Sequence, residues 1–221
     1  MLQQAIQVNP QAWEKAYLRF ETPDQEIRKF IRLLRKLGAD GWSRESQIVE
    51  LFCGRGNGLR ALHRLGFAQV EGVDLSPTLA AEYQGPGTIH VADCRKLPFA
   101  DGSKDIAIVQ GGLHHLLSLP KDLEQTLAQV RRILRPGGRF VVVEPWLTPF
   151  LRVVIFLARY RLPRLIWAKF DALATMIELE RATYGNWLRC PGVILNLLKQ
   201  HFAIEHCDCA WGQLTFVGRK E

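Results

Sequence analysis

The run from Ile48 to Gly58, IVELFCGRGNG, is the feature that most limits how this chain folds. Residues suited to a buried strand lead into a turn rich in glycine, and apolar residues at helical spacing follow at 59–65. Further along, Asp74 ends a second apolar run. Glycine lets the backbone approach a bound molecule closely, and an acidic strand end can accept hydrogen bonds from ribose hydroxyls. The layout therefore predicts an α/β chain with a site for a nucleoside cofactor.

Short apolar strands alternate with helices between residues 47 and 145. This alternation is typical of a parallel sheet that is covered by helices on both faces. A turn at 136–138, Pro-Gly-Gly, is expected between the last helix and the last strand of the series. The expected strands are 47–52, 70–73, 88–91, 106–110 and 139–144, and the expected helices are 59–65, 77–83 and 123–134.

Helical patterns flank this series on both sides. Thr22 is a plausible start and Gly38 a plausible stop for the second N-terminal helix. Two final strands around 211–213 can pair as an antiparallel hairpin. The expected flanking helices are 11–20, 24–37, 149–160, 171–184 and 191–201, and the final strands are 203–209 and 214–218.

The length of 221 residues fits one domain with additions, and a hydrophobic fraction of 48% excludes wholesale disorder. We divide the chain into an N-terminal helical cap (1–46), a core (47–145), an inserted helical cap that is the acceptor region (146–201) and C-terminal strands that complete the sheet (202–221). The net charge of +7 lies mainly outside the core, because residues 47–145 have eleven basic and ten acidic side chains.

The cysteines and the first residues bear on the cellular compartment. Five scattered cysteines do not form a disulfide framework, and Cys207 and Cys209 are expected to be reduced thiols on one face of a strand. Met1 to Pro10 shows no basic segment followed by an apolar run, and no stretch has the length of a membrane span. We therefore expect a cytoplasmic protein.

Three further segments lie where a nucleoside cofactor would be contacted. Asp93 and Cys94 follow the strand at 88–91, and the Asp93 carboxylate can accept a hydrogen bond from the exocyclic amine of adenine. The segment 110–115, QGGLHH, follows the strand at 106–110, and the turn 134–138, LRPGG, precedes the next strand.

Together with the glycine turn and Asp74, these segments make residues 47–145 resemble the class I S-adenosylmethionine-dependent methyltransferases, in particular their small-molecule group. The resemblance implies a Rossmann-like, seven-stranded, mostly parallel sheet with helices on both faces. It also implies S-adenosyl-L-methionine as the cofactor.

Candidate site residues follow from the same resemblance. His114 and His115 lie at the implied methyl-transfer end, where each is either a structural histidine or a catalytic one, as a general base or a group that positions the acceptor. No metal site is expected. The residues implied to bind the cofactor are Glu50, Phe52, Cys53, Gly54, Gly56, Asp74, Leu75, Asp93, Cys94, Gln110, Gly111 and Gly112.

Phe52 departs from the family's first motif, which commonly has glycine at this place. Because phenylalanine lacks the freedom of glycine at positive φ, we expect ordinary backbone geometry at Phe52 and a turn made by Gly54 and Gly56. This departure bears on whether the class of acceptor follows the family, whereas the cofactor implied by the resemblance is unchanged.

The segment 146–170 has five basic residues and no acidic one among many apolar residues. Two interpretations of 149–169 remain open. The segment is either a lid whose apolar face is buried on the core, or an interfacial helix in peripheral contact with a membrane that holds a dissolved acceptor. Candidate pocket residues in the cap are Glu178, Glu180, Tyr184 and Trp187.

We expect the chain to methylate an oxygen, nitrogen or carbon atom of a small, partly apolar acceptor. One alternative is a methyltransferase that acts on RNA or on a membrane lipid or quinone. Another is a non-catalytic protein that keeps the cofactor site. The sequence pI of about 9.4 fits a polyanionic partner, but no known nucleic-acid-binding module is evident.

Overall fold

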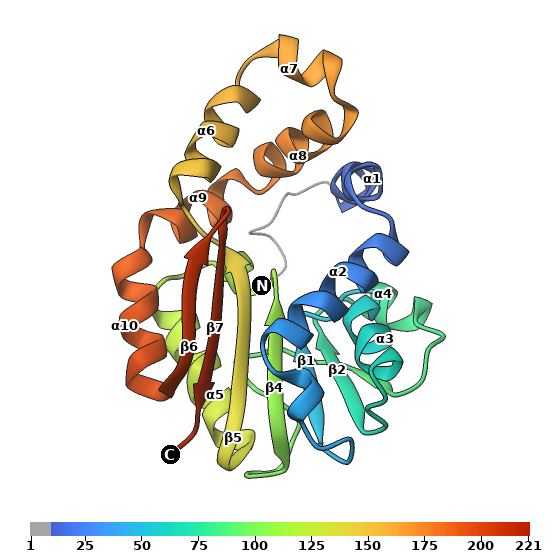
Figure 1. Cartoon of the computed structure of the whole chain (residues 1–221), viewed down its shortest axis with the longest axis vertical. Coiled ribbons are helices and arrows are strands. Elements are labelled where there is room, and N and C mark those ends of the chain that lie inside the picture. The colour runs from blue at the N-terminus through green and yellow to red at the C-terminus, as the bar shows by residue number, and fades with distance from the viewer. Residues whose placement is uncertain (1–9) are drawn as a thin grey trace.

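The computed structural model describes residues 10–221, so the first nine residues of the predicted segment 1–46 lie outside the described part. A single seven-stranded sheet runs through the molecule (Figure 1). Its strands are β1 (Ile48–Leu51), β2 (Val70–Asp74), β3 (Thr88–Val91), β4 (Lys104–Gln110), β5 (Leu134–Pro145), β6 (Ala203–Ala210) and β7 (Gln213–Arg219).

The strand order is β3-β2-β1-β4-β5-β7-β6. The first five strands are parallel, and β7 pairs antiparallel with both β5 and β6. The predicted Rossmann-like sheet with a terminal antiparallel hairpin is therefore confirmed. The strand order reverses between β1 and β4, because β2 and β3 are added on one side of β1 and β4 and β5 on the other. In open parallel sheets of this kind, ligands bind outside the carboxyl ends of the strands at such a switch point.

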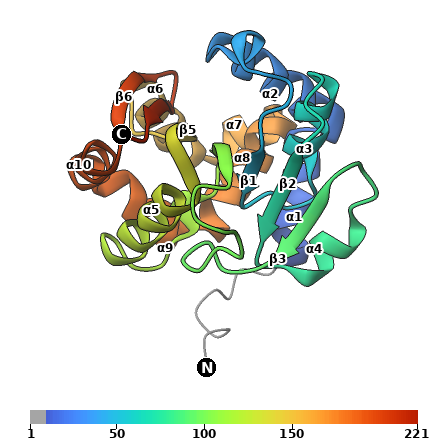
Figure 2. The ribbon, with the colours of Figure 1, turned by 90° about the horizontal axis from the view of Figure 1, so that it is seen from below.

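Helices cover both faces of the sheet (Figure 2). On one face lie α2 (Pro23–Lys36), α3 (Asn57–Arg64) and α4 (Pro77–Glu82), and on the other lie α5 (Lys121–Ile133) and α10 (Pro191–His201). Apolar side chains of the central strands alternate between two buried clusters, one under each layer of helices. In β1, for example, Val49 and Leu51 pack toward α5, whereas Ile48 packs toward α2 and α3.

The ends of several helices follow from local chemistry that the sequence already indicates. Thr22 caps α2 in a capping box with Gln25, and Gly38 adopts a left-handed φ of 92° just beyond the helix. A short 3₁₀ helix, η1 (Ala39–Gly41), then leads toward β1. The predicted turn at 136–138 lies within the bounds of β5, where the register between β4 and β5 is interrupted and Gly137 has positive φ.

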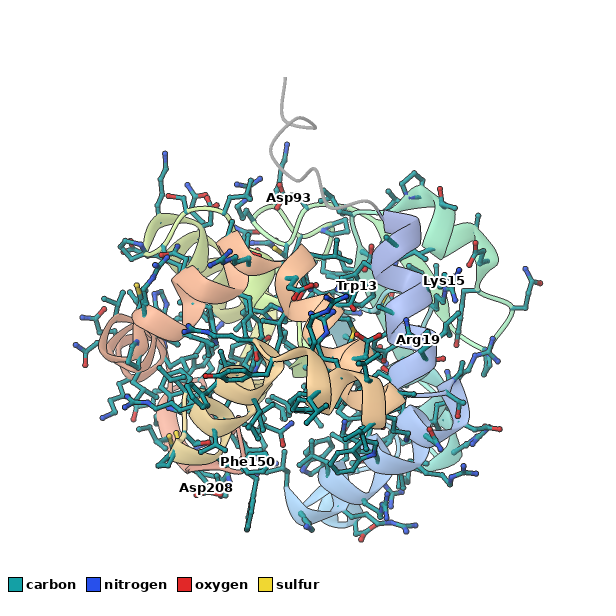
Figure 3. All side chains as sticks on the ribbon, turned by 90° about the horizontal axis from the view of Figure 1, so that it is seen from above. Trp13, Lys15, Arg19, Asp93, Phe150 and Asp208 are labelled. Atoms are coloured by element: carbon teal, nitrogen blue, oxygen red, sulfur yellow. The ribbon has the colours of Figure 1, made fainter. Side chains whose placement is uncertain are left out.

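The remaining helices gather above the carboxyl end of the sheet. They are α1 (Pro10–Phe20), α6 (Pro149–Ala158), α7 (Arg161–Ile166), α8 (Ala168–Leu179) and α9 (Arg181–Arg189). Helix α1 packs against α8, and the guanidinium of Arg19, which Figure 3 labels on α1, pairs with the carboxylate of Asp171 at 2.5 Å. The N-terminal helix and the inserted helices thus cover one end of the molecule together.

The inserted segment corrects two sequence predictions. The single helix expected at 171–184 is two helices, because α8 ends at Leu179 and α9 begins at Arg181, and α7 was not predicted. Apolar residues continue through the break at Glu180, so hydrophobic spacing alone does not reveal it. Within residues 10–221, no helix has both the length and the apolar character needed to cross a bilayer.

Trp187 holds the inserted segment to the sheet. Its side chain is fully buried, and its indole nitrogen donates a hydrogen bond of 2.8 Å to the backbone oxygen of Pro145 at the end of β5. The sequence placed Trp187 in the acceptor pocket, but the structure places it in the core beneath α9.

Replacing this anchor should destabilise the fold. We expect Trp187→Ala to lower the free energy of unfolding by about 3–5 kcal/mol, because it removes a buried aromatic side chain and leaves a cavity. Trp167 is 68% exposed, so Trp167→Ala should change stability by less than about 0.5 kcal/mol. Urea denaturation of the two variants tests this, and equal losses would show that Trp187 is no anchor.

Candidate active site

The turn between β1 and α3 opens the site at the switch point. Phe52 has a φ of 57°, Gly54 of 49° and Gly56 of 71°. The expectation of ordinary backbone geometry at Phe52 is therefore wrong. Left-handed geometry costs a non-glycine residue about 1–3 kcal/mol, so neighbouring contacts must hold it in place.

The contact that holds Phe52 comes from the neighbouring strand end. A Cβ atom built on Gly112, just after β4, would lie 2.4 Å from the Cβ of Phe52. The aromatic ring of Phe52 also packs against the core cluster on the α5 side. Gly112 lacks a side chain at the place that Phe52 fills, so the turn after β1 and the turn after β4 fit together as a pair.

Asp74 fixes the glycine turn from the end of β2. One carboxylate oxygen accepts a hydrogen bond from the backbone N–H of Gly54 and the other from that of Ser76, each at 2.8 Å. A carboxylate has further acceptor positions, so Asp74 can also accept from ligand hydroxyls. Leu75, the next residue, is exposed. Asp74, Leu75 and Gly54 are thus brought together, as predicted from the sequence.

Two buried oxygen atoms lie at the ends of the central strands without a protein partner. Among the described residues, neither Oε2 of Glu50 nor Oε1 of Gln110 has a hydrogen-bond partner. Burial, and then the nearby charge of Glu26, raise the pKa of Glu50 well above its ordinary value. Gly58 makes room for this carboxyl group, since a Cβ there would lie 1.9 Å from it. Buried acceptors of this kind call for a donor, and a polar ligand can supply one.

Asp93 and Cys94 lie on the loop after β3. The guanidinium of Arg95 contacts both carboxylate oxygens of Asp93, and this hydrogen bonding lowers the pKa of Asp93. Arg95 also bonds Asp122 of α5. The side chain of Cys94 is buried beside Thr126, and burial raises its thiol pKa to about 11.

Cys53 is a second packing thiol. It is buried, its sulfur fills the space beside Gly72 of β2, and burial raises its pKa. Because the thiolate is the nucleophilic form, neither Cys53 nor Cys94 has the character of a nucleophile.

The two histidines occupy a 3₁₀ turn, η2 (Leu113–His115), which follows Gly111 and Gly112. Glu144, at the end of β5, holds this turn. Its Oε1 accepts hydrogen bonds of 2.7 Å from the backbone N–H groups of Gly112 and Leu113, and its Oε2 contacts Nδ1 of His114 at 2.8 Å. Sequence reasoning missed Glu144, although an acidic residue that ends the apolar run FVVVE is a signal for a buried carboxylate.

Residues of the cap reach the histidines from the other side. Glu180 lies 3.6 Å from Nε2 of His114 and 3.7 Å from Nδ1 of His115, and the ring of Tyr184 meets that of His114 edge-on. Glu178 instead pairs with Arg164 away from the histidines. Of the four predicted pocket residues, Glu180 and Tyr184 therefore contact the pair.

The environment gives the two rings opposite protonation states at neutral pH. Burial alone would lower the pKa of His114, but the charge and hydrogen bond of Glu144, together with Glu180, raise that pKa to about 9. Burial and the adjacent charge of His114 lower the pKa of His115 to about 4. His114 is thus a buried cation, and His115, whose side chain is 35% exposed, is neutral. Paired groups whose pKa values are pushed apart are typical of acid–base sites.

His114, His115 and Glu180 each offer one ligand atom within 4.8 Å of the others, a spacing that a metal ion could use. Direct ion pairing between the charged His114 and the two carboxylates accounts for the same arrangement. The expectation of no metal stays a prediction.

Comparison with known proteins gives consistent results. Residues 49–142 match the family described as a methyltransferase domain. The chain is 33% identical over 173 residues to a ubiquinone/menaquinone biosynthesis C-methyltransferase UbiE of Desulfotalea psychrophila, a match that covers 73% of this chain and 63% of the relative. The chain spans 63%, 56% and 61% of the first three curated relatives that it matches.

Solved structures share the fold. The PH0226 protein from Pyrococcus horikoshii OT3 has a TM-score of 0.64 at 22% identity, over 92% of this chain and 96% of that one. A geranyl diphosphate methyltransferase in complex with SAM has a TM-score of 0.61 at 16% identity, over 90% and 86% of the two chains.

The fit between Phe52 and Gly112 can be tested by stability. We expect Gly112→Ala to lower the free energy of unfolding by about 1–3 kcal/mol, because the new methyl group overlaps Phe52. In a Phe52→Gly background the same change should cost less, with a coupling energy of about 0.5–3 kcal/mol. Gly192→Ala is the control, since nothing lies within 4 Å of its added Cβ. Additive effects in urea denaturation would refute the contact.

Proposed function

The chain belongs to the class I S-adenosylmethionine-dependent methyltransferases, and from that premise we propose that it methylates a small, partly apolar acceptor at oxygen or at an activated carbon. The observation that carries the proposal is the pairing of a neutral His115 with a cationic His114 in the 3₁₀ turn that follows Gly112. The domain match and the strand order support the premise.

The residues at the switch point fit S-adenosyl-L-methionine. The backbone of Gly54 and Gly56 would lie against it, and the Asp74 carboxylate would accept hydrogen bonds from its ribose hydroxyls. The unpartnered oxygens of Glu50 and Gln110 are acceptors suited to its amino group. When bound, the cofactor supplies a methyl group that a positive sulfur atom makes electrophilic.

The protein's own contribution to the reaction is positioning and proton removal. A phenol or enol becomes a strong nucleophile when its hydroxyl proton leaves. The ring of His115 is neutral and partly exposed, so it can accept that proton, and Glu180, 3.7 Å from its Nδ1, offsets the cost of protonating a ring whose pKa is lowered by burial and by His114. The oxyanion that forms is conjugated to the adjacent carbon, so either the oxygen or that carbon would accept the methyl group as the bond from methyl to sulfur breaks. Transfer to carbon would be followed by loss of that carbon's own proton. Cationic His114 lies beside His115, with the two ring centroids 4.1 Å apart, so its positive charge would stabilise the negative charge that develops on the acceptor.

The acceptor is proposed from the walls of the site. Tyr184 and the ring of Phe52 offer apolar surfaces, which favours a ring or an apolar chain over a sugar. The UbiE relative from Desulfotalea psychrophila, a C-methyltransferase of quinone biosynthesis by name, points to a hydroquinone-like ring. We also propose a cytoplasmic location, which the five free thiols support.

Two variants separate cofactor binding from proton removal. Asp74→Ala should weaken the binding of S-adenosylmethionine by at least roughly tenfold, because the carboxylate loses both its turn contacts and its ligand contacts. His115→Ala should keep this binding and lower kcat for a phenolic acceptor by about 10²–10⁴-fold. Calorimetry measures the first effect, and mass spectrometry over a panel of phenols, hydroquinones and amines measures the second.

His206→Ala is the matched control, because His206 is an exposed histidine on β6 that should affect neither measurement. An intact wild-type protein that binds neither S-adenosylmethionine nor S-adenosylhomocysteine would overturn the proposed function. Undiminished turnover in His115→Ala would remove the general base. Methylation of amines alone would replace the phenolic acceptor with one that needs no base.

A further inference from the structure

Exposed apolar side chains concentrate in one short segment of the molecule. Of the 16 large apolar side chains that are exposed among the described residues, nine lie between residues 150 and 167. We call these nine the cap patch. They are Phe150, Val153, Phe156, Leu157, Tyr160, Leu162, Leu165, Ile166 and Trp167.

The lid interpretation explains little of this segment. Only Leu151 and Ala158 of α6 are buried, and no residue of α7 is. Leu165 and Ile166 are 80% and 78% exposed. A helix that served only to cover the core would turn its apolar side chains inward, whereas α6 and α7 leave most of theirs in solvent.

Basic side chains surround the cap patch. Arg152, Arg159, Arg161 and Lys169 are exposed, and within residues 10–221 none of them pairs with an acidic side chain. The acidic groups of α8 are already engaged, because Arg164 holds the carboxylates of both Asp171 and Glu178. Four basic side chains are therefore left for an external anionic surface.

The turn between β6 and β7 extends the same surface. Trp211 is 81% exposed, and its ring packs edge-on against that of Phe150, with the ring centroids 5.6 Å apart. The backbone N–H of Gly212 donates to the hydroxyl of Thr148, which also caps α6, so the turn and the helix are tied together. Figure 3 looks onto this end of the molecule and shows Phe150 on its surface.

We propose that the cap patch and Trp211 dock on an anionic lipid bilayer, with α6 and α7 lying in the plane of its interface. Aromatic and aliphatic side chains would enter the headgroup boundary, and the four basic side chains would meet the anionic lipids. A second copy of this chain would bring the same unpaired positive charges face to face, which disfavours that occupant.

The cap patch and the active site share the same structural support. Helix α6 follows β5, which carries Glu144 next to its last residue, and the segment after α7 supplies Glu180 and Tyr184 to the histidines. Docking would therefore place the acceptor side of the site beside the bilayer, so that an acceptor dissolved in lipid reaches it directly. This role in delivery rests on the proposed function, whereas the docking itself does not.

Vesicle flotation tests the docking. The wild-type chain should float with vesicles of phosphatidylcholine and phosphatidylglycerol and stay free with vesicles of phosphatidylcholine alone. In Arg159→Gln/Arg161→Gln, partitioning should fall roughly fivefold for each charge lost. In Leu165→Gln/Ile166→Gln it should fall by roughly tenfold or more, since two exposed apolar side chains no longer enter the interface.

Matched controls lie elsewhere on the surface. Arg32→Gln/Lys36→Gln removes the same charge from exposed positions of α2, and Ile204→Gln removes an exposed apolar side chain near the start of β6, far along that strand from Trp211. Both should float like the wild type. All of these positions are exposed, so unfolding is not expected, and circular dichroism checks it.

Several results would overturn the docking. They are no flotation of the wild type, equal loss in the controls, or a stable dimer that the cap-patch variants dissociate. Retention on RNA at matched salt, with no flotation, would also overturn it and would favour a nucleic-acid partner. Binding of S-adenosylmethionine, measured by calorimetry on the same preparations, reports the proposed function separately.

Discussion

A single buried carboxylate organises the site. The side chain of Glu144, near the end of β5, has no exposed surface. It accepts hydrogen bonds from two backbone N–H groups of the turn after β4 and also contacts His114. A buried carboxylate without partners would be strongly destabilising, so the fold is stable only if that turn closes on it. The apolar strand that carries Glu144 therefore determines where the two histidines lie.

The two histidines differ in protonation because two carboxylates, those of Glu144 and Glu180, contact His114, whereas only that of Glu180 lies near His115. His114 lies between Glu144 and Glu180 and keeps its proton, whereas burial and the adjacent positive charge of His114 keep His115 neutral. Glu180 lies at the junction between α8 and α9, so the cap supplies one of the two negative charges that stabilise the cationic His114. The cap thus has two roles, since its inner residues set the chemistry while its outer apolar residues stay free for a partner.

The sequence predicts the parts of this arrangement that local rules govern. The alternation of strands and helices, the glycine turn after Leu51 and the acidic end of β2 follow from hydrophobic spacing and from backbone requirements. The left-handed geometry of Phe52 does not, because it depends on the empty space at Gly112, about sixty residues further along the chain. Glu144 was missed for the same reason, since its partners lie on another strand end and only the folded sheet brings them together.

The assignment of His115 as the base depends on the charge state of each ring, which nuclear magnetic resonance reads directly. In a titration of the nitrogen-15-labelled protein, the ring of His114 should stay protonated up to a pH of about 9, and that of His115 should stay neutral down to about 4. If both rings instead titrated together near the ordinary histidine value of about 6.5, Glu144 would not keep His114 protonated while His115 is neutral, and the proposed proton transfer would be wrong.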